Sequence, residues 1–169
     1  SKFIEDNFDV LKYTILEERN NKFIVNAKSV IVKNKSITSL TNGLFVWGIV
    51  DGDFRCRDCQ SLISLDGAPK EVGNDFNCSG CKSLKTLEGA PKKVGRSFNC
   101  TYCKSLKTLE GAPKEVGGNF DCSRCDSLMS LDGVQKVIEQ NFDCLYCNSL
   151  KTLKGAPKKV GGNFDCSRC

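Results

Sequence analysis

The sequence contains no histidine and only one methionine and one tryptophan among its 169 residues. Histidine is the most common general acid or base in enzymes and the most common metal ligand, so its absence argues against both kinds of site. No nucleophile–base pair and no glycine-rich phosphate loop takes its place. We therefore expect a protein that is not an enzyme and that uses no cofactor and no metal.

Long apolar runs are also missing from the sequence. No stretch approaches the roughly 18 apolar residues that a membrane helix needs, and residues 1–6 lack the apolar run of a signal peptide. The net charge is only +5, and acidic residues are mixed with the basic ones, so nucleic acid is not the expected partner. We expect no membrane association and a cytoplasmic location.

Phenylalanine and cysteine, in contrast, recur with a fixed period of 22 residues. The phenylalanines of this repeat are Phe54, Phe76, Phe98, Phe120, Phe142 and Phe164. Two cysteines follow each of them, and these are Cys56, Cys59, Cys78, Cys81, Cys100, Cys103, Cys122, Cys125, Cys144, Cys147, Cys166 and Cys169. All 12 cysteines therefore belong to the repeat, and a period of this length is typical of a solenoid.

The rest of each unit indicates how its backbone is folded. Side chains alternate along a strand, so a Phe-x-Cys strand points its first and third residues into the core. Four of the five complete units continue with Gly-Ala-Pro-Lys, and the exception is Gly133-Val134-Gln135-Lys136. Because proline is excluded from the interior of a helix, this return segment is turn or extended chain. The prediction is a mainly β solenoid in which short strands stack in parallel.

The frame Val-x-x-x-Phe-x-Cys-x-x-Cys-x-Ser-Leu-x-x-Leu-x-Gly-Ala-Pro resembles the leucine-rich repeat. Phe120 and Cys122 match its two inward strand leucines, Cys125 matches its ladder position, and Leu128 and Leu131 match the leucines that follow. Phenylalanine and cysteine replace the usual leucines, and one extra residue separates Cys125 from Leu128. The resemblance implies a leucine-rich-repeat-type solenoid with a short-stranded parallel sheet, an irregular convex side and a small N-terminal cap.

A second resemblance concerns the return segment. The phrase Gly-Ala-Pro-Lys-x-Val-Gly-Gly-x-Phe-x-Cys-x-x-Cys is similar to a short cysteine-containing repeat in proteins of tailed bacteriophages. It implies a phage-encoded protein that acts in the cytoplasm of the infected bacterial host. Its expected role is to bind and inhibit a host or defence protein.

Along the chain we expect three parts. Residues 1–29 form an N-terminal cap, residues 30–49 a degenerate first repeat with a loop, and residues 50–169 the tandem repeats, the last one incomplete. Lys35 stands at the ladder position of the degenerate repeat, and the spacing within residues 1–21 fits helix and strand alike. Because the chain stops at Cys169, halfway through a unit, we expect either a truncated protein or a homodimer that pairs through the uncapped C-terminal end.

The tandem Cys-x-x-Cys motifs leave three interpretations open. Two such pairs can hold zinc, but stacking in register places the cysteines in columns and not in isolated tetrahedral clusters. Disulfides along a column satisfy the required Cα separation, but a reducing cytosol opposes them. The interpretation that we favour is a structural ladder of small buried side chains, in which the second cysteine donates to backbone carbonyls.

Three outward-pointing residues per unit form the expected binding face. Tyrosine, arginine and leucine on such a face favour a protein partner, and the run of aspartates changes its charge toward the C-terminus. The predicted partner-binding residues are Arg55, Arg57, Asn99, Tyr102, Asp121, Arg124, Asp143, Leu145, Tyr146 and Asp165. Two alternatives remain: nucleic-acid binding through the lysine-rich edge, and a metal or redox role of the cysteines.

Overall fold

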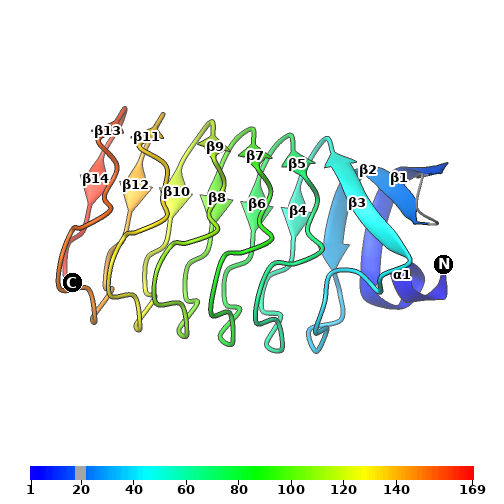
Figure 1. The fold of residues 1–169 in the computed structure, drawn as a ribbon, viewed down its shortest axis with the longest axis horizontal. Coiled ribbons are helices and arrows are strands. Elements are labelled where there is room, and N and C mark those ends of the chain that lie inside the picture. The colour runs from blue at the N-terminus through cyan, green and yellow to red at the C-terminus, as the bar shows by residue number, and fades with distance from the viewer. Residues whose placement is uncertain (18–21) are drawn as a thin grey trace.

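The computed structural model describes residues 1–17 and 22–169. Its chain winds into a β-solenoid with one short helix, α1 (Lys2–Asn7), and the two chain ends lie at opposite ends of the coil (Figure 1). The prediction of a mainly β solenoid with parallel short strands is confirmed. Within the described residues, no helix has the length and apolar character needed to cross a bilayer.

The phenylalanines of the repeat begin one column of two-residue strands. Neighbouring strands pair in parallel and in register, so that Phe98 lies between Phe76 and Phe120. The column consists of β4 (Phe54–Arg55), β6 (Phe76–Asn77), β8 (Phe98–Asn99), β10 (Phe120–Asp121), β12 (Phe142–Asp143) and β14 (Phe164–Asp165). The first cysteine of each unit extends the ladder, as where the Cys78 N–H donates to the Asn99 carbonyl at 2.9 Å.

The return segments form a second column of strands, which the sequence did not predict. It consists of β5 (Glu71–Val72), β7 (Lys93–Val94), β9 (Glu115–Val116), β11 (Val137–Ile138) and β13 (Lys159–Val160). In each strand only the second residue points into the core, so alternation extends over too few residues to be recognised. This column is continuous from β5 to β9, whereas β11 and β13 form a separate two-stranded sheet.

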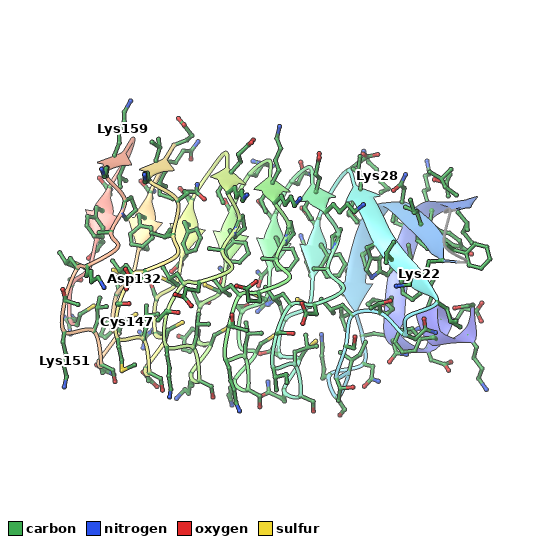
Figure 2. All side chains as sticks on the ribbon, in the orientation of Figure 1. Lys22, Lys28, Asp132, Cys147, Lys151 and Lys159 are labelled. Carbon is green, nitrogen blue, oxygen red and sulfur yellow. The ribbon has the colours of Figure 1, made fainter. Side chains whose placement is uncertain are left out.

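Stacked aromatic rings fill the core beside the first column (Figure 2). The ring centroids of Phe54 and Phe76 are 5.4 Å apart, and those of Phe76 and Phe98 are 5.5 Å apart. These rings are fully buried, and burial of one phenylalanine side chain stabilises a fold by about 1.5–3 kcal/mol. The rings, with the leucines and cysteines of each unit, form one continuous core along the coil.

The N-terminal residues cover one end of this core. Strand β1 (Phe8–Glu17) pairs antiparallel with β2 (Phe23–Val32), and β2 pairs first with β3 (Phe45–Val50) and then with β4. The single strand β2 therefore starts both columns. The spacing within residues 1–21 fitted helix and strand alike, and residues 1–17 contain both, because the short helix α1 precedes strand β1. Residues 18–21 lie outside the described residues.

An aromatic cluster joins this end to the stacked rings. Trp47 is buried, and its ring centroid lies 5.2 Å from those of Phe8 and Phe45 and 6.1 Å from that of Phe54. Its indole N–H donates to the Leu40 carbonyl at 3.0 Å. The only tryptophan of the chain thus connects β1 and β3 with the first strand of the repeats.

Candidate functional site

The residues that follow the phenylalanines do not all point freely into solvent. Asn99 and Asp121 are half-buried, and each side-chain oxygen accepts a hydrogen bond from its own turn. Asn99 Oδ1 accepts from the Thr101 N–H at 3.0 Å, and Asp121 Oδ1 from the Ser123 N–H at 2.9 Å. Such bonds hold the backbone in a turn, so this row supports the shape of the binding face as well as its charge.

Asp143 departs from that arrangement. The Leu145 N–H, which corresponds to the donors above, bonds instead to Ser123 Oγ of the preceding turn at 3.2 Å. Burial raises the pKa of the Asp143 carboxyl, and the stacked carboxylates of Asp121 and Asp165 raise it further. In the last turn, hydrogen bonds from Ser167 lower the pKa of the Asp165 carboxyl. The aspartate row is therefore a column of like charges in which ionisation of Asp143 is disfavoured.

The two predicted arginines at the other end of the face are exposed. Arg55 forms an ion pair with Asp53 of its own turn, with 2.7 Å between Nη2 and Oδ2. Arg57 lies beside a shallow surface pocket that also includes Asn77, Ser79 and Tyr102. Charges of both signs therefore lie at this end of the face, since Arg55 is paired with Asp53 and Arg57 lines the same pocket as Asp58.

The residue before each second cysteine has a left-handed backbone. Its φ is 57° at Asp58, 73° at Gly80, 59° at Tyr102, 60° at Arg124, 55° at Tyr146 and 59° at Arg168. For a residue other than glycine this conformation costs roughly 1–2 kcal/mol. Tyrosine and arginine occupy four of these six positions. Gly80 shows that the repeat also accepts glycine here, for which the left-handed backbone carries no steric cost.

The four side chains stack on one another along the coil. The guanidinium carbon of Arg124 lies 5.5 Å from the centroid of the Tyr102 ring and 4.3 Å from that of Tyr146. Arg168 continues the stack at 5.4 Å from the Tyr146 ring. A cation and the aromatic face that it lies over attract each other by about 0.5–1 kcal/mol at exposed sites. We call Tyr102, Arg124, Tyr146 and Arg168 the Tyr–Arg stack.

A notch adjoins the Tyr–Arg stack at Gly80. A surface hollow is lined here by Gly80, Asp58, Tyr102, Thr101 and Lys82, and the Asp58 carboxylate occupies the place that a Cβ of residue 80 would take. The Tyr102 side chain, 47% exposed, forms one side of the notch. Sequence reasoning identified Tyr102 but missed the notch, for which the signal was the single glycine in an otherwise substituted row.

The cysteines form two internal columns. In five successive pairs the second cysteine donates its S–H to the backbone carbonyl of the first cysteine one turn back, as from Cys81 Sγ to Cys56 O at 3.1 Å. At the first turn the Lys35 ammonium donates to the Val32 carbonyl of its own turn at 2.6 Å, and this carbonyl is the one that Cys59 would otherwise bond. Cys59, left without that acceptor, donates to the Arg57 carbonyl at 3.7 Å.

Several thiols in these columns resist ionisation. Burial raises the pKa of Cys147 to about 12, and the hydrogen bond with Cys125 together with burial raises the pKa of Cys100 well above its usual range. All 12 cysteines are free thiols, and ten of them are buried. Among the described residues no group of three or more cysteine, aspartate or glutamate side chains is arranged to hold a metal ion.

Comparison of the chain with protein-family models, with curated proteins and with solved structures finds no match. The resemblances to the leucine-rich repeat and to phage repeat proteins therefore stay predictions. So does the homodimer through the C-terminal end, where the last turn leaves Phe164 39% exposed.

Proposed function

We propose that this chain is a non-enzymatic protein-binding repeat module and that the Tyr–Arg stack, with the notch at Gly80, is its contact surface. The observation that carries this proposal is the left-handed backbone beneath Tyr102, Arg124 and Tyr146. Backbone strain of this kind is typical of functional positions, where the side chain is needed despite its cost. Glycine would remove the strain, but it would also remove the surface.

The chemistry of this surface suits a protein partner. Tyrosine and arginine are the residue types most enriched among those that dominate binding energy, and a notch beside an aromatic ring can receive one side chain of the partner. Mutual stacking reduces the freedom of these long side chains before binding, which lowers the entropy cost of ordering them.

The neighbouring aspartate row opposes a polyanionic partner. Asp121, Asp143 and Asp165 lie in the same turns as the Tyr–Arg stack and outnumber its two arginines, so the net charge of these turns would repel a phosphate backbone. The same carboxylates would attract basic side chains of a protein. The expected partner thus presents a basic strip over the aspartates and an apolar or aromatic side chain in the notch.

The resemblance to phage repeat proteins supports a narrower form of the proposal. In this form the partner is a host or defence protein of an infected bacterium, and the chain acts in the cytoplasm of that cell by blocking the partner.

Affinity capture from bacterial lysate tests the proposal. The immobilised chain is compared with a Tyr102→Gly/Tyr146→Gly variant, which the left-handed backbone tolerates, and with a Lys85→Ala/Lys107→Ala control on exposed loops elsewhere. We expect one stoichiometric protein with the wild-type and control chains and its loss with the double-glycine variant. Retention of the same proteins by all three chains would contradict the proposal.

A further inference from the structure

The second column of strands is interrupted between β9 and β11. Between β7 and β9, the N–H groups of Lys114, Gly117 and Gly118 donate to carbonyls of the preceding turn at 2.7–3.0 Å. Between β11 and β13, the N–H groups of Lys158, Gly161 and Gly162 donate in the same way at 2.8–2.9 Å. Between β9 and β11, both fully described, none of the corresponding bonds from Lys136, Val137, Glu139 or Gln140 forms.

A single change in the repeat explains the interruption. Glycine follows the buried valine in the other return strands, as at Gly95, Gly117 and Gly161, and a Cβ at any of these positions would overlap the carbonyl oxygen of the preceding turn. Glu139 stands at this position in the irregular unit. Its side chain cannot approach the Gly117 carbonyl as closely as glycine does, so the two strands separate on this side of the coil.

The interruption leaves complementary groups on two facing walls. On the β9 wall the carbonyls of Lys114 and Val116 lack the donors that equivalent carbonyls have elsewhere, and on the β11 wall the N–H groups of Val137 and Glu139 lack acceptors. The first column stays paired across the same two turns, at Phe120 and Phe142, so the separation is a slot open on one side.

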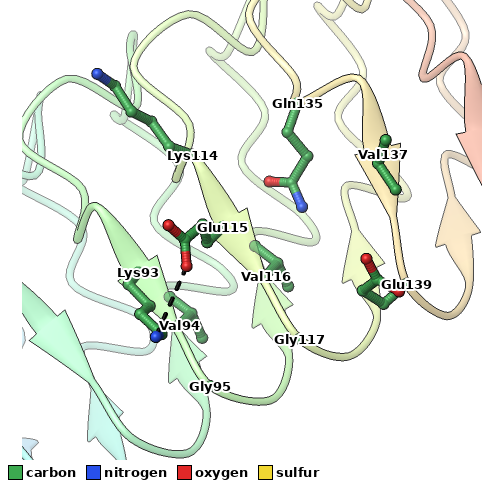
Figure 3. Close-up of a pocket in the computed structure, with 10 residues that line it drawn as sticks. All are labelled: Lys93, Val94, Gly95, Lys114, Glu115, Val116, Gly117, Gln135, Val137 and Glu139. Carbon is green, nitrogen blue, oxygen red and sulfur yellow. Dashed lines mark ion pairs between the residues drawn. The ribbon is translucent and has the colours of Figure 1, made fainter.

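A surface cavity lies at this slot (Figure 3). It is lined by Val94, Val116 and Val137, by the ion pair of Lys93 and Glu115, and by Gln135 and Glu139 (Figure 3). Gln135 takes the place of the proline found in the other units, and its Oε1 is buried without a hydrogen-bond partner. A buried amide oxygen left unpaired is unfavourable, and a donor arriving in the slot would satisfy it.

We propose that this slot binds an extended peptide segment of a partner, which enters as an additional parallel strand paired with β9. The main chain of the segment supplies N–H groups to the free Lys114 and Val116 carbonyls at the spacing of a β-sheet, whereas the Cβ of Glu139 keeps β11 from pairing with it. Insertion requires the walls to separate to roughly 9–10 Å, twice the strand spacing. Because β9 and β11 share no ladder bond, no hydrogen bond of the second column has to break when they separate.

The walls also define the sequence of the segment. In register with Glu115 on one side and Val137 on the other, a basic side chain would face the Glu115 carboxylate. The next residue would join the buried column of Val116 and Ile138, which favours a β-branched side chain. The residue after it lies against the Gly117 carbonyl and must be glycine. The preferred segment therefore reads basic, β-branched, glycine. This binding site is separate from the Tyr–Arg stack.

A synthetic peptide with the sequence of residues 155–163, Gly-Ala-Pro-Lys-Lys-Val-Gly-Gly-Asn, provides the probe. Its control carries proline in place of valine, which removes one N–H. Binding of the labelled peptide is followed by fluorescence anisotropy with the wild-type chain, a Glu139→Gly variant that lets the ladder close, and a Glu139→Ala variant that keeps the Cβ. Hydrogen exchange of the Val137, Glu139 and Gln140 amides is measured in the same samples.

We expect the wild-type chain and Glu139→Ala to bind the valine peptide and Glu139→Gly to bind it at least tenfold more weakly. The proline peptide should not bind. The three amides should exchange faster than those of Glu115, Gly117 and Gly118 in the free chain. Equal binding by the glycine and alanine variants, no binding by the wild-type chain, or amides already protected without peptide would overturn the proposal.

Discussion

The guanidinium carbon of Arg124 lies 4.3 Å from the centre of the Tyr146 ring, and both residues have a left-handed backbone, with φ of 60° and 55°. Because successive turns stack in register, side chains from residues 22 apart meet repeatedly along the coil. An otherwise unfavourable conformation thereby presents an ordered row of aromatic and cationic groups.

Tyr146→Gly and Tyr146→Ala both remove the tyrosine ring, and they differ by one Cβ. Since φ is positive at this position, the glycine variant should be more stable than the alanine variant by about 1–2 kcal/mol. Urea denaturation of the two proteins measures this difference. Equal stabilities would show that residue 146 does not have a left-handed backbone.

Gly95→Ala should destabilise the protein by about 1–3 kcal/mol, because the new Cβ would overlap the Gly73 carbonyl oxygen of the preceding turn. Thermal unfolding monitored by circular dichroism measures the loss. Arg96→Ala is the matched control, since this neighbouring side chain is exposed and its loss should leave the melting temperature nearly unchanged. Equal melting temperatures for the two variants would contradict the close approach of successive turns.

Asp143→Asn should raise the free energy of unfolding at neutral pH. Burial and the neighbouring Asp121 and Asp165 raise the pKa of the Asp143 carboxyl, so its stability contribution is complete below the pKa of the unfolded chain and is lost as pH rises through the folded pKa. The benefit of the asparagine should therefore vanish in acid. Denaturation at pH 7 and at pH 3 checks this, with the exposed Asp58→Asn as control. A benefit of equal size at both pH values would rule out the electrostatic cause.

The buried thiols should react slowly and should make the protein sensitive to alkaline pH. The pKa values of Cys100, Cys122 and Cys147 are raised, so the stability that these thiols contribute is complete below the pKa of an unfolded cysteine, about 8.5, and is lost as pH rises above it. Stability should thus fall from about pH 9 upward. Thiol titration of the native protein at pH 8 should label the exposed Cys169 fast and the ten buried cysteines only on unfolding. Fast labelling of all 12 would contradict the buried columns.

Much of the core could be predicted from the sequence, because the 22-residue period repeats the same inward residues. Phe98, Cys100 and Cys103 are buried as their spacing indicates, and even Lys35 replaces a cysteine at the ladder position. The second strand column was missed, because each return strand has one inward side chain and offers no alternation to recognise.

The candidate site was predicted in residue types but not in geometry. The alternation of side chains predicted that Tyr102 and Tyr146 lie on the outward face of a strand. The backbone is left-handed at both positions instead. The only sign of this in the sequence was the glycine at the equivalent position, Gly80. The slot beside Glu139 could not be predicted, since it depends on the distance between a Cβ and a carbonyl of another turn. Its visible signals in the sequence were the irregular return segment Gly133-Val134-Gln135-Lys136 and Glu139 in place of the usual glycine.

Photo-crosslinking from single positions tests the central claim, that the Tyr–Arg stack is the partner-binding surface. A photoreactive phenylalanine analogue replaces Tyr102 in one protein and the exposed Lys107 in another, and both are irradiated in bacterial lysate. We predict one crosslinked protein from position 102, absent when Tyr146 is also changed to glycine, and no specific product from position 107. Identical products from both positions, or none from position 102, would contradict the account.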